Sequence, residues 1–243
     1  MTDYKLYANL VKLLRYQHVS LIACADLQSL PADIRYDLPT GVLLGVALSP
    51  SIIACIGNGP TPDYAQEYVR VNLLLDKLAQ QCSNFLKERG FNTHARKATV
   101  TAINKNNLST PVPHKTLATL AGAGWVGKCA LLVTKLFGSA IRFNSVFTDA
   151  PLPHGRAIET SKCGKCDACV IACPVDAPSG KNWHRDMQRK QIYNAHACCD
   201  FTLANSQKPG IGQAICGICI QACPFTKSYL KKSHASESDL SIT

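Results

Sequence analysis

One stretch of the chain decides its fold, Cys163-Gly-Lys-Cys166-Asp-Ala-Cys169-Val-Ile-Ala-Cys173-Pro174. Its C-x2-C-x2-C-x3-C-P spacing is the ligand pattern of proteins with two iron-sulfur clusters, in which three thiolates bind one 4Fe-4S cubane and the fourth binds another. A tight loop can turn the first three thiolates towards one cubane, while the fourth begins a helix that leads away from it. The motif therefore predicts two clusters.

A second copy of the motif follows, Cys216-Gly-Ile-Cys219-Ile-Gln-Ala-Cys223-Pro224, and it lacks its first cysteine. Gln213 stands at the missing position, so another side chain must complete the second site. The only thiols nearby are the adjacent pair Cys198-Cys199. Paired zinc sites are the alternative, because C-x2-C is also a zinc signature. Zinc knuckles seldom combine this triplet with a Cys-Pro ending, so iron-sulfur clusters are the stronger prediction.

The thiols divide into two predicted ligand sets, because the last cysteine of each motif binds the other cluster in two-cluster proteins. The first set is Cys163, Cys166, Cys169 and Cys223. The second set is Cys173, Cys216, Cys219 and one member of the adjacent pair.

Composition supports metal binding rather than disulfide bonding. The chain has 243 residues and 13 cysteines, and no signal for export is apparent. We expect a cytoplasmic protein, where thiols stay reduced and clustered cysteines indicate a metal. No run of about 18 apolar residues predicts a membrane span. The net charge is +10, but two clusters would each bring about -2, and the remaining charge is spread as on a solvated surface.

The rest of the pattern predicts a mixed α+β or α/β fold in two parts. Residues 1–150 are expected to form a sheet covered by helices, followed by a two-cluster module over residues 151–228 and a flexible tail over residues 229–243. The composition break at Asp149–Gly155 marks the expected boundary. Apolar spacing predicts helices over 6–14, 62–89 and 116–121, and strands over 19–23, 41–48, 52–56, 97–103, 131–134 and 141–147.

The block from Pro111 to Lys128, with Ala130–Thr134 and Gly138-Ser139 after it, resembles a known family. It is similar to the P-V-L-E-R-x-L-A-x-x-A-G-L-G-W-I-G-K-N-x-L-L-I and G-S block of epoxyqueuosine reductases and the related reductive dehalogenases. Thr148–Pro153 is similar to the segment that joins the two domains of that family. The stretch from Cys199 to Leu203 resembles the family's C-I-S-Y-L, which favours Cys199 over Cys198 as the replacement ligand. The resemblance covers about residues 40–226.

The resemblance implies an oxidoreductase whose two clusters pass electrons to a cobalamin in its base-off form, for reductive cleavage of a carbon-oxygen or carbon-heteroatom bond. The cobalamin contacts that it implies are Gly122, Gly124, Trp125, Gly127 and Lys128. Glycines suit this role because they let the main chain approach a flat macrocycle. The structural alternative is a tight turn at these glycines with Trp125 in the core. The chain has no D-x-H-x-x-G motif, so histidine ligation is not expected.

Two departures from the family pattern bear on the substrate. Leu108 stands where the family has a proton-donating aspartate, and leucine cannot supply a proton. The chain also lacks the family's C-terminal helical repeats, which help to bind tRNA. Substitute proton donors or anion-holding groups are Tyr64, His114, Lys115 and Arg142, each of which also fits a surface or core role.

The leading hypothesis is an iron-sulfur reductase that takes electrons from a low-potential donor of the ferredoxin or flavodoxin type and acts on a small molecule or a protein. One alternative is an electron-transfer or reductive-activation partner with no corrinoid of its own. A second is a minimal epoxyqueuosine reductase acting on tRNA, which the two departures disfavour. Cys24, Cys55 and Cys82 are expected to be core residues, and Cys129 is either a buried inert thiol or a neighbour of the corrinoid.

Overall fold

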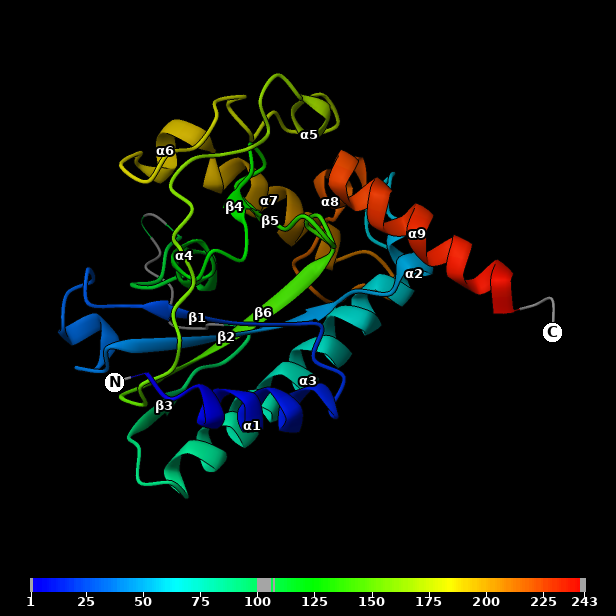
Figure 1. Ribbon diagram of the computed structural model, residues 1–243. Helices are drawn as coiled ribbons and strands as arrows, with labels where there is room; N and C mark the ends of the chain where they lie inside the picture. Colours follow the sequence, from blue (N-terminus) through cyan, green and yellow to red (C-terminus); the bar gives the residue numbers. More distant parts are fainter. Residues whose placement is uncertain (1, 100–105, 107, 241–243) are drawn as a thin grey trace. The chain divides into compact units, whose positions relative to one another are not determined.

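The computed structural model describes residues 2–99, 106 and 108–240 (Figure 1). By the packing of its backbone the chain divides into two compact units that interleave along the sequence. Unit 1 comprises Met1–Ala47, Arg70–Trp125 and Arg142–Glu159, and unit 2 comprises Leu48–Val69, Val126–Ile141 and Thr160–Thr243. Unit 2 thus adds two earlier segments to the cysteine-rich region. The boundary expected at residues 149–155 stays a prediction.

Unit 1 is built on a four-stranded sheet of order β1-β2-β6-β3. The strands are β1 (Leu21–Asp26), β2 (Thr40–Ala47), β3 (Thr93–Ala95) and β6 (Ile141–Thr148). β1 pairs antiparallel with β2, and β3 pairs antiparallel with β6. Most of β2 and β6 is buried, in keeping with their central positions in the sheet, and a short 3-10 helix, η1 (Asp33–Arg35), lies in the β1–β2 connection.

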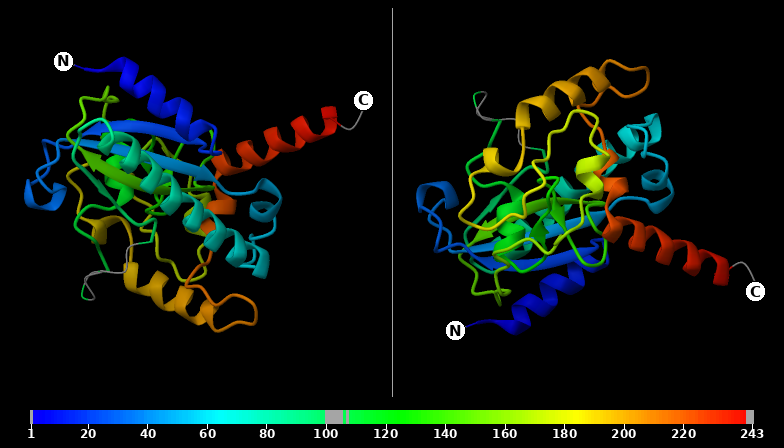
Figure 2. Two further views of the ribbon diagram at one scale, coloured as in Figure 1. Left: turned by 90° about the horizontal axis from the view of Figure 1, so that it is seen from below. Right: turned by 90° about the horizontal axis from the view of Figure 1, so that it is seen from above.

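Helices cover both faces of this sheet. α1 (Tyr4–Arg15) and the Arg70–Lys87 part of α3 (Pro62–Lys87) lie on one side, and α4 (His114–Leu120) packs against β1 and β2 on the other (Figures 1 and 2). The buried stripe of α1 is Leu6, Leu10 and Leu14, at the spacing of one helix face. The Asp3 carboxylate caps this helix by accepting a hydrogen bond from the Leu6 amide at 2.8 Å. The predicted mixed helix and sheet fold is confirmed.

Two predicted strands are wrong in whole or in part. Residues 50–54 form helix α2 (Pro50–Ala54) instead of a strand over 52–56, because Pro50 at the first helical turn fixes a helical φ. A strand is also expected over 97–103, but residues 97–99 form none, and the nearest strand, β3, ends at Ala95. The amide of Ala98 bonds to the Asp76 carboxylate rather than to a neighbouring strand, at 2.8 Å. Residues 100–103 lie outside the described part of the chain.

Unit 2 consists of short helices around the cysteine motifs and a two-stranded sheet. The helices, besides α2 and the start of α3, are α5 (Ala168–Ile171), α6 (Arg189–Ile192), α7 (Ala195–Ser206), α8 (Ile218–Ala222) and α9 (Pro224–Leu240), and the small sheet pairs β4 (Trp125–Val126) with β5 (Leu132–Val133). α5 packs on α8, which also contacts α2 and α9. Residues 229–240 continue α9, so they are helical, and the predicted flexibility of the tail stays a prediction.

A tight approach fixes the start of α9. Gly138 has a φ of +56°, and a Cβ there would lie 2.2 Å from the Thr226 amide nitrogen. The Ser139 amide donates to the Thr226 hydroxyl at 3.1 Å. Glycine at position 138 therefore lets the β5–β6 connection close against the first turn of α9. No helix in the described part of the chain is long and apolar enough to cross a membrane.

Candidate functional site

The first cysteine motif forms a loop that leads into α5. The Cys166 amide donates to the Cys163 carbonyl at 3.1 Å, and Gly164 between them has a φ of +57°, which closes the turn. Cys169 lies on α5 and is buried. Cys173 follows the helix, and its sulfur accepts a hydrogen bond from the Ala177 amide at 3.4 Å. The loop thus separates the first three thiols from the fourth, as the motif predicts.

Cys223 of the second motif lies near thiols of the first. Burial raises the pKa of the Cys223 thiol most, and the charges of Cys163 and Cys169 raise it further, against backbone hydrogen bonds that lower it. Cys223 directly follows α8, and α8 packs on α5, which carries Cys169. Three of the four members of the first predicted ligand set are therefore electrostatic neighbours.

A second group of thiols also draws on both motifs. Burial raises the pKa of Cys216, and the charges of Cys198 and Cys173 raise it further. Burial likewise raises the pKa of the Cys198 thiol most, and the charge of Cys173 raises it further. A hydrogen bond with the hydroxyl of Tyr193 acts in the opposite direction. Cys173 of the first motif thus lies with Cys216 of the second. Cys198 of the adjacent pair lies near both, and the predicted ligand role of Cys199 stays a prediction.

Cys129 connects the two groups. Its thiol forms side-chain hydrogen bonds with Cys169 and Cys219. The bond with Cys169 lowers the pKa of Cys129, whereas the bond with Cys219 and burial raise it, and the net effect is a raised pKa. The side chain is only 5% exposed. The sequence alone does not predict these contacts, because Cys129 lies outside both motifs and no spacing rule links it to them.

Soft thiolate donors in partly buried surroundings suit iron-sulfur clusters. All nine cysteines from Cys163 to Cys223 are free thiols that are buried or half-buried. Among the residues that the structure describes, no three His, Cys, Asp or Glu side chains converge on the position of a single ion. The thiols supply the donor chemistry that such clusters need, and the two predicted ligand sets stay predictions.

The residues expected to contact a corrinoid are closely packed within the protein. Gly122 has a φ of +70°, and a Cβ there would lie 2.4 Å from the Arg156 carbonyl oxygen. A Cβ on Gly127 would lie 2.7 Å from a methyl carbon of Val133. Trp125 is 1% exposed, and the Lys128 ammonium is bound by a carboxylate. These contacts explain why glycine stands at positions 122 and 127, and the cobalamin contacts at Gly122, Gly124, Trp125, Gly127 and Lys128 stay predictions.

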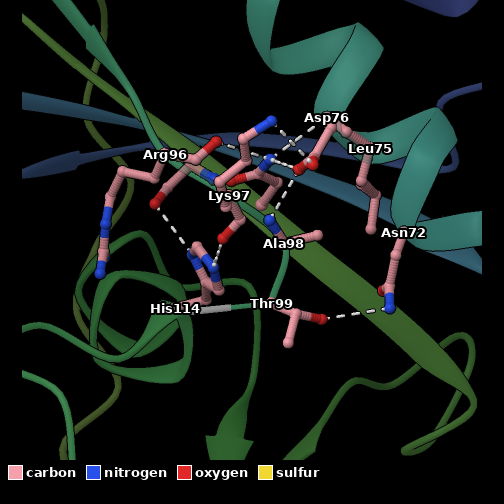
Figure 3. A network of polar contacts seen from close by, with 10 residues as sticks. Asn72, Leu75, Asp76, Arg96, Lys97, Ala98, Thr99 and His114 are labelled. Carbon is pink, nitrogen blue, oxygen red and sulfur yellow. Dashed lines mark hydrogen bonds and ion pairs between the residues drawn. The ribbon is translucent and has the colours of Figure 1, made fainter. Parts of the chain in front are cut away.

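The candidate proton donor His114 is part of a polar network in unit 1 (Figure 3). Its Nε2 lies 3.0 Å from the Lys97 carbonyl oxygen and its Nδ1 lies 2.9 Å from the Ser145 hydroxyl. Since a carbonyl only accepts, Nε2 carries the proton and Nδ1 accepts from the hydroxyl. Burial and, to a smaller extent, the charge of Arg96 lower the pKa of His114 to about 4. The imidazole is therefore neutral near pH 7.

Asp76 is the acceptor at the other side of this network (Figure 3). Its carboxylate accepts from the Ala98 amide at 2.8 Å and from the Asn144 side chain at 3.1 Å, and pairs with the Lys97 ammonium at 3.4 Å. Arg96 donates to the Val112 carbonyl. These contacts hold residues 96–99 against α3 and β6, and a catalytic role of His114 stays a prediction.

Of the remaining candidates, Arg142 and Lys115 belong to unit 1 with His114, and Tyr64 belongs to unit 2. Arg142 donates from Nε to Asn72 at 3.0 Å and lies near His114, whose pKa its charge lowers. Lys115 follows His114 on α4 and is half-buried. Tyr64, on the part of α3 that belongs to unit 2, is 3% exposed. Their catalytic roles stay predictions.

The other cysteines of the chain are mostly core residues, as expected. Cys24 and Cys82 are buried, and burial raises the pKa of each, to about 12 for Cys24. Cys55 is the exception, because it ends α2 as an exposed residue whose thiol donates to the Ser51 carbonyl at 3.4 Å. The prediction that Cys55 is buried is wrong, because it assumed a strand where the chain forms a helix.

Comparison with known proteins supports the assignment of the first motif. Residues 157–179 match the family model of the 4Fe-4S binding domain. The chain is 32% identical over 121 residues to the epoxyqueuosine reductase of Pseudomonas aeruginosa, a match that takes in 49% of this chain and 33% of the relative. The match therefore spans about a third of the length of that relative.

Solved structures share the fold over most of the chain. A catabolic reductive dehalogenase in complex with 3-bromo-4-hydroxybenzoic acid aligns with a TM-score of 0.68 and 14% identity, covering 89% of this chain and 31% of the other. An epoxyqueuosine reductase with an epoxyqueuosine-modified tRNA-Tyr stem loop aligns with a TM-score of 0.63 and 19% identity, covering 93% and 66%. The resemblance predicted from the sequence is confirmed.

Proposed function

We propose that this relative of the epoxyqueuosine reductases and reductive dehalogenases is an iron-sulfur reductase that conducts electrons through two 4Fe-4S clusters. The observation that carries the proposal is the grouping of thiols across the two motifs, Cys223 with Cys163 and Cys169, and Cys216 with Cys173. Exchange of the last cysteine between motifs is the arrangement of two-cluster proteins.

The chain would hold each cluster with four thiolates. Cys163, Cys166, Cys169 and Cys223 would bind the first, and Cys173, Cys216, Cys219 and Cys198 or Cys199 the second. The family resemblance favours Cys199 for the last position, whereas the electrostatic interactions of Cys198 with Cys173 and Cys216 favour Cys198. We propose Cys198, because a ligand must lie beside the other members of its set. The clusters supply one-electron transfer, and the chain keeps their ligands away from bulk water.

The proposed acceptor of the electrons is a corrinoid in its base-off form. Its support is the likeness in sequence to epoxyqueuosine reductases and in fold to reductive dehalogenases. Gly122, Gly124, Trp125, Gly127 and Lys128 would be its contacts by the family resemblance.

The second candidate function is an electron-transfer partner that keeps no corrinoid. The specific observation in its favour is that the side-chain space at Gly122 and Gly127 is taken up by protein. Under either function we propose a low-potential donor of the ferredoxin or flavodoxin type and a small-molecule or protein substrate. The tRNA bound by one structural neighbour is a less favoured substrate, because Leu108 replaces the proton-donating aspartate.

One experiment separates the two functions. The protein is purified without oxygen, reconstituted with iron, sulfide and cob(II)alamin, and then desalted before its absorbance spectrum is recorded. Corrinoid bands that survive desalting support the reductase with a bound corrinoid. Cluster absorbance alone supports the electron-transfer partner, and the absence of cluster absorbance overturns both.

A further inference from the structure

Lys128 carries a buried charge beside the first cysteine motif. Its side chain is 5% exposed, and its ammonium lies 2.6 Å from the Asp167 carboxylate. A buried ammonium is costly to desolvate unless a carboxylate pairs with it at close range. Lysine is rarely fully buried without such a partner, so the position of Lys128 depends on Asp167.

Asp167 lies inside the motif, between Cys166 and Cys169, and its carboxylate does not cap the helix that follows. The residue occupies the N-cap of α5, yet its side chain makes no capping hydrogen bond. An aspartate at an N-cap usually accepts from the backbone amides of the first turn. Here the carboxylate reaches Lys128 instead, which ties the motif loop to the turn formed by residues 127–130.

That turn contacts the ligand thiols directly. Cys129, next to Lys128, forms side-chain hydrogen bonds with Cys169 and Cys219. Lys128 precedes Cys129 in this turn, and its ammonium lies 2.6 Å from the carboxylate of Asp167, two residues before Cys169. The ammonium therefore lies within electrostatic range of the Cys169 sulfur. Lys128 thus both holds the loop and places a positive charge beside one of the predicted ligands.

We propose that Lys128 is a positioning residue of the first iron-sulfur site, which fixes the Cys166–Cys169 loop through Asp167 and raises the reduction potential of that cluster. This inference rests on the proposed function. Reduction adds negative charge to a cluster, and a nearby cation in a partly buried site stabilises the reduced form. It assigns to the cysteine motif a lysine that the family resemblance assigns to the corrinoid.

The test compares the midpoint potentials of the two clusters in reconstituted full-length variants by a redox titration followed by electron paramagnetic resonance. Cys166→Ser first identifies which signal belongs to the first cluster. Lys128→Met keeps the length of the side chain and removes its charge, and Lys128→Arg keeps the charge. Lys165→Met is the matched control, since Lys165 belongs to the same motif but is exposed.

We expect Lys128→Met to shift the first potential to a more negative value, or to lose that cluster alone, while the second potential stays unchanged. Lys128→Arg should restore the first signal, and Lys165→Met should leave both signals as in the wild type. If Lys128→Met keeps full iron and an unchanged first potential, the inference is overturned.

If Lys128→Met does not fold, Asp167→Asn provides the decision, because Asp167 is half-exposed. This variant should alter the first signal and leave the second as it was, and an unchanged first signal would also overturn the inference. A wild-type protein without clusters would instead refute the proposed function, which keeps the two failures distinct.

Discussion

Cys173 and Cys216 are electrostatic neighbours although they belong to different cysteine motifs. Burial raises the pKa of the Cys216 thiol most, and the charge of Cys173 contributes to the rise. This pairing is the reciprocal of that between Cys223 and the first motif. Each predicted site therefore draws its ligands from both motifs, as in two-cluster proteins.

The first prediction concerns the ligand that replaces the missing cysteine at position 213. Cys198→Ser should lose the second cluster and keep the first, because Cys198 lies with Cys173 and Cys216. Cys199→Ser is the matched control and should keep both clusters. Iron content and the electron paramagnetic resonance of the reduced protein measure the outcome. The reverse result would restore the ligand indicated by the family resemblance.

The second prediction concerns pH. Burial lowers the pKa of His114 to about 4, from an ordinary value of 6.5. Between these two values the unfolded chain binds the proton and the folded protein does not. The contribution of the neutral His114 to the free energy of unfolding is therefore complete above pH 6.5 and is lost as the pH drops towards 4. His114→Gln should weaken this dependence.

Thermal unfolding between pH 7 and 5 checks this prediction, with His18→Asn as the control because His18 is exposed. An NMR titration in which the His114 imidazole gains its proton near pH 6.5 would contradict the structural role of the network.

The third prediction concerns the close approach at Gly138. Gly138→Ala should lower the free energy of unfolding by more than about 1 kcal/mol, because a Cβ would strain a positive φ and also meet the Thr226 amide. Gly212→Ala is the control, since Gly212 has a φ of +59°, close to that of Gly138, with nothing within 4 Å of its Cβ position. Denaturant unfolding should show the smaller loss for Gly212→Ala, and equal losses would mean that the contact with α9 contributes nothing.

The fourth prediction concerns the substrate. We expect neither the wild type nor Leu108→Asp to convert epoxyqueuosine in tRNA, although a positioned acid typically contributes about 10²- to 10⁴-fold to a rate. The variant should fold, because Leu108 has a φ of +51° and aspartate tolerates this conformation better than leucine. Leu108→Asn is the matched variant without the acid. Conversion by the wild type would establish the tRNA-dependent alternative.

Much of the fold follows from local patterns in the sequence. The apolar spacing of α1 and the long helix α3 could be predicted because each buries one face. The strand expected at 52–56 could not be distinguished from a short helix, since both are brief apolar runs and Pro50 decides between them. The strand expected over 97–103 is found instead as β3 at Thr93–Ala95, because its pairing with β6 depends on residues distant in sequence.

The candidate site shows the same division. The ligand spacing of the first motif is local, so it could be read directly from Cys163 to Cys173. The contacts of Cys129 and the ion pair of Lys128 could not, because each joins residues on opposite sides of the predicted domain boundary. Cys198 and Cys199 are adjacent in sequence, and only the packing of α7 distinguishes them.

The most direct test of the central claim is the count of iron and acid-labile sulfide in protein purified and reconstituted without oxygen. Two 4Fe-4S clusters predict about eight iron and about eight sulfide per chain, and Cys166→Ser and Cys216→Ser should each reduce these counts. Stoichiometric zinc without acid-labile sulfide, or a full count that neither substitution reduces, would contradict the account.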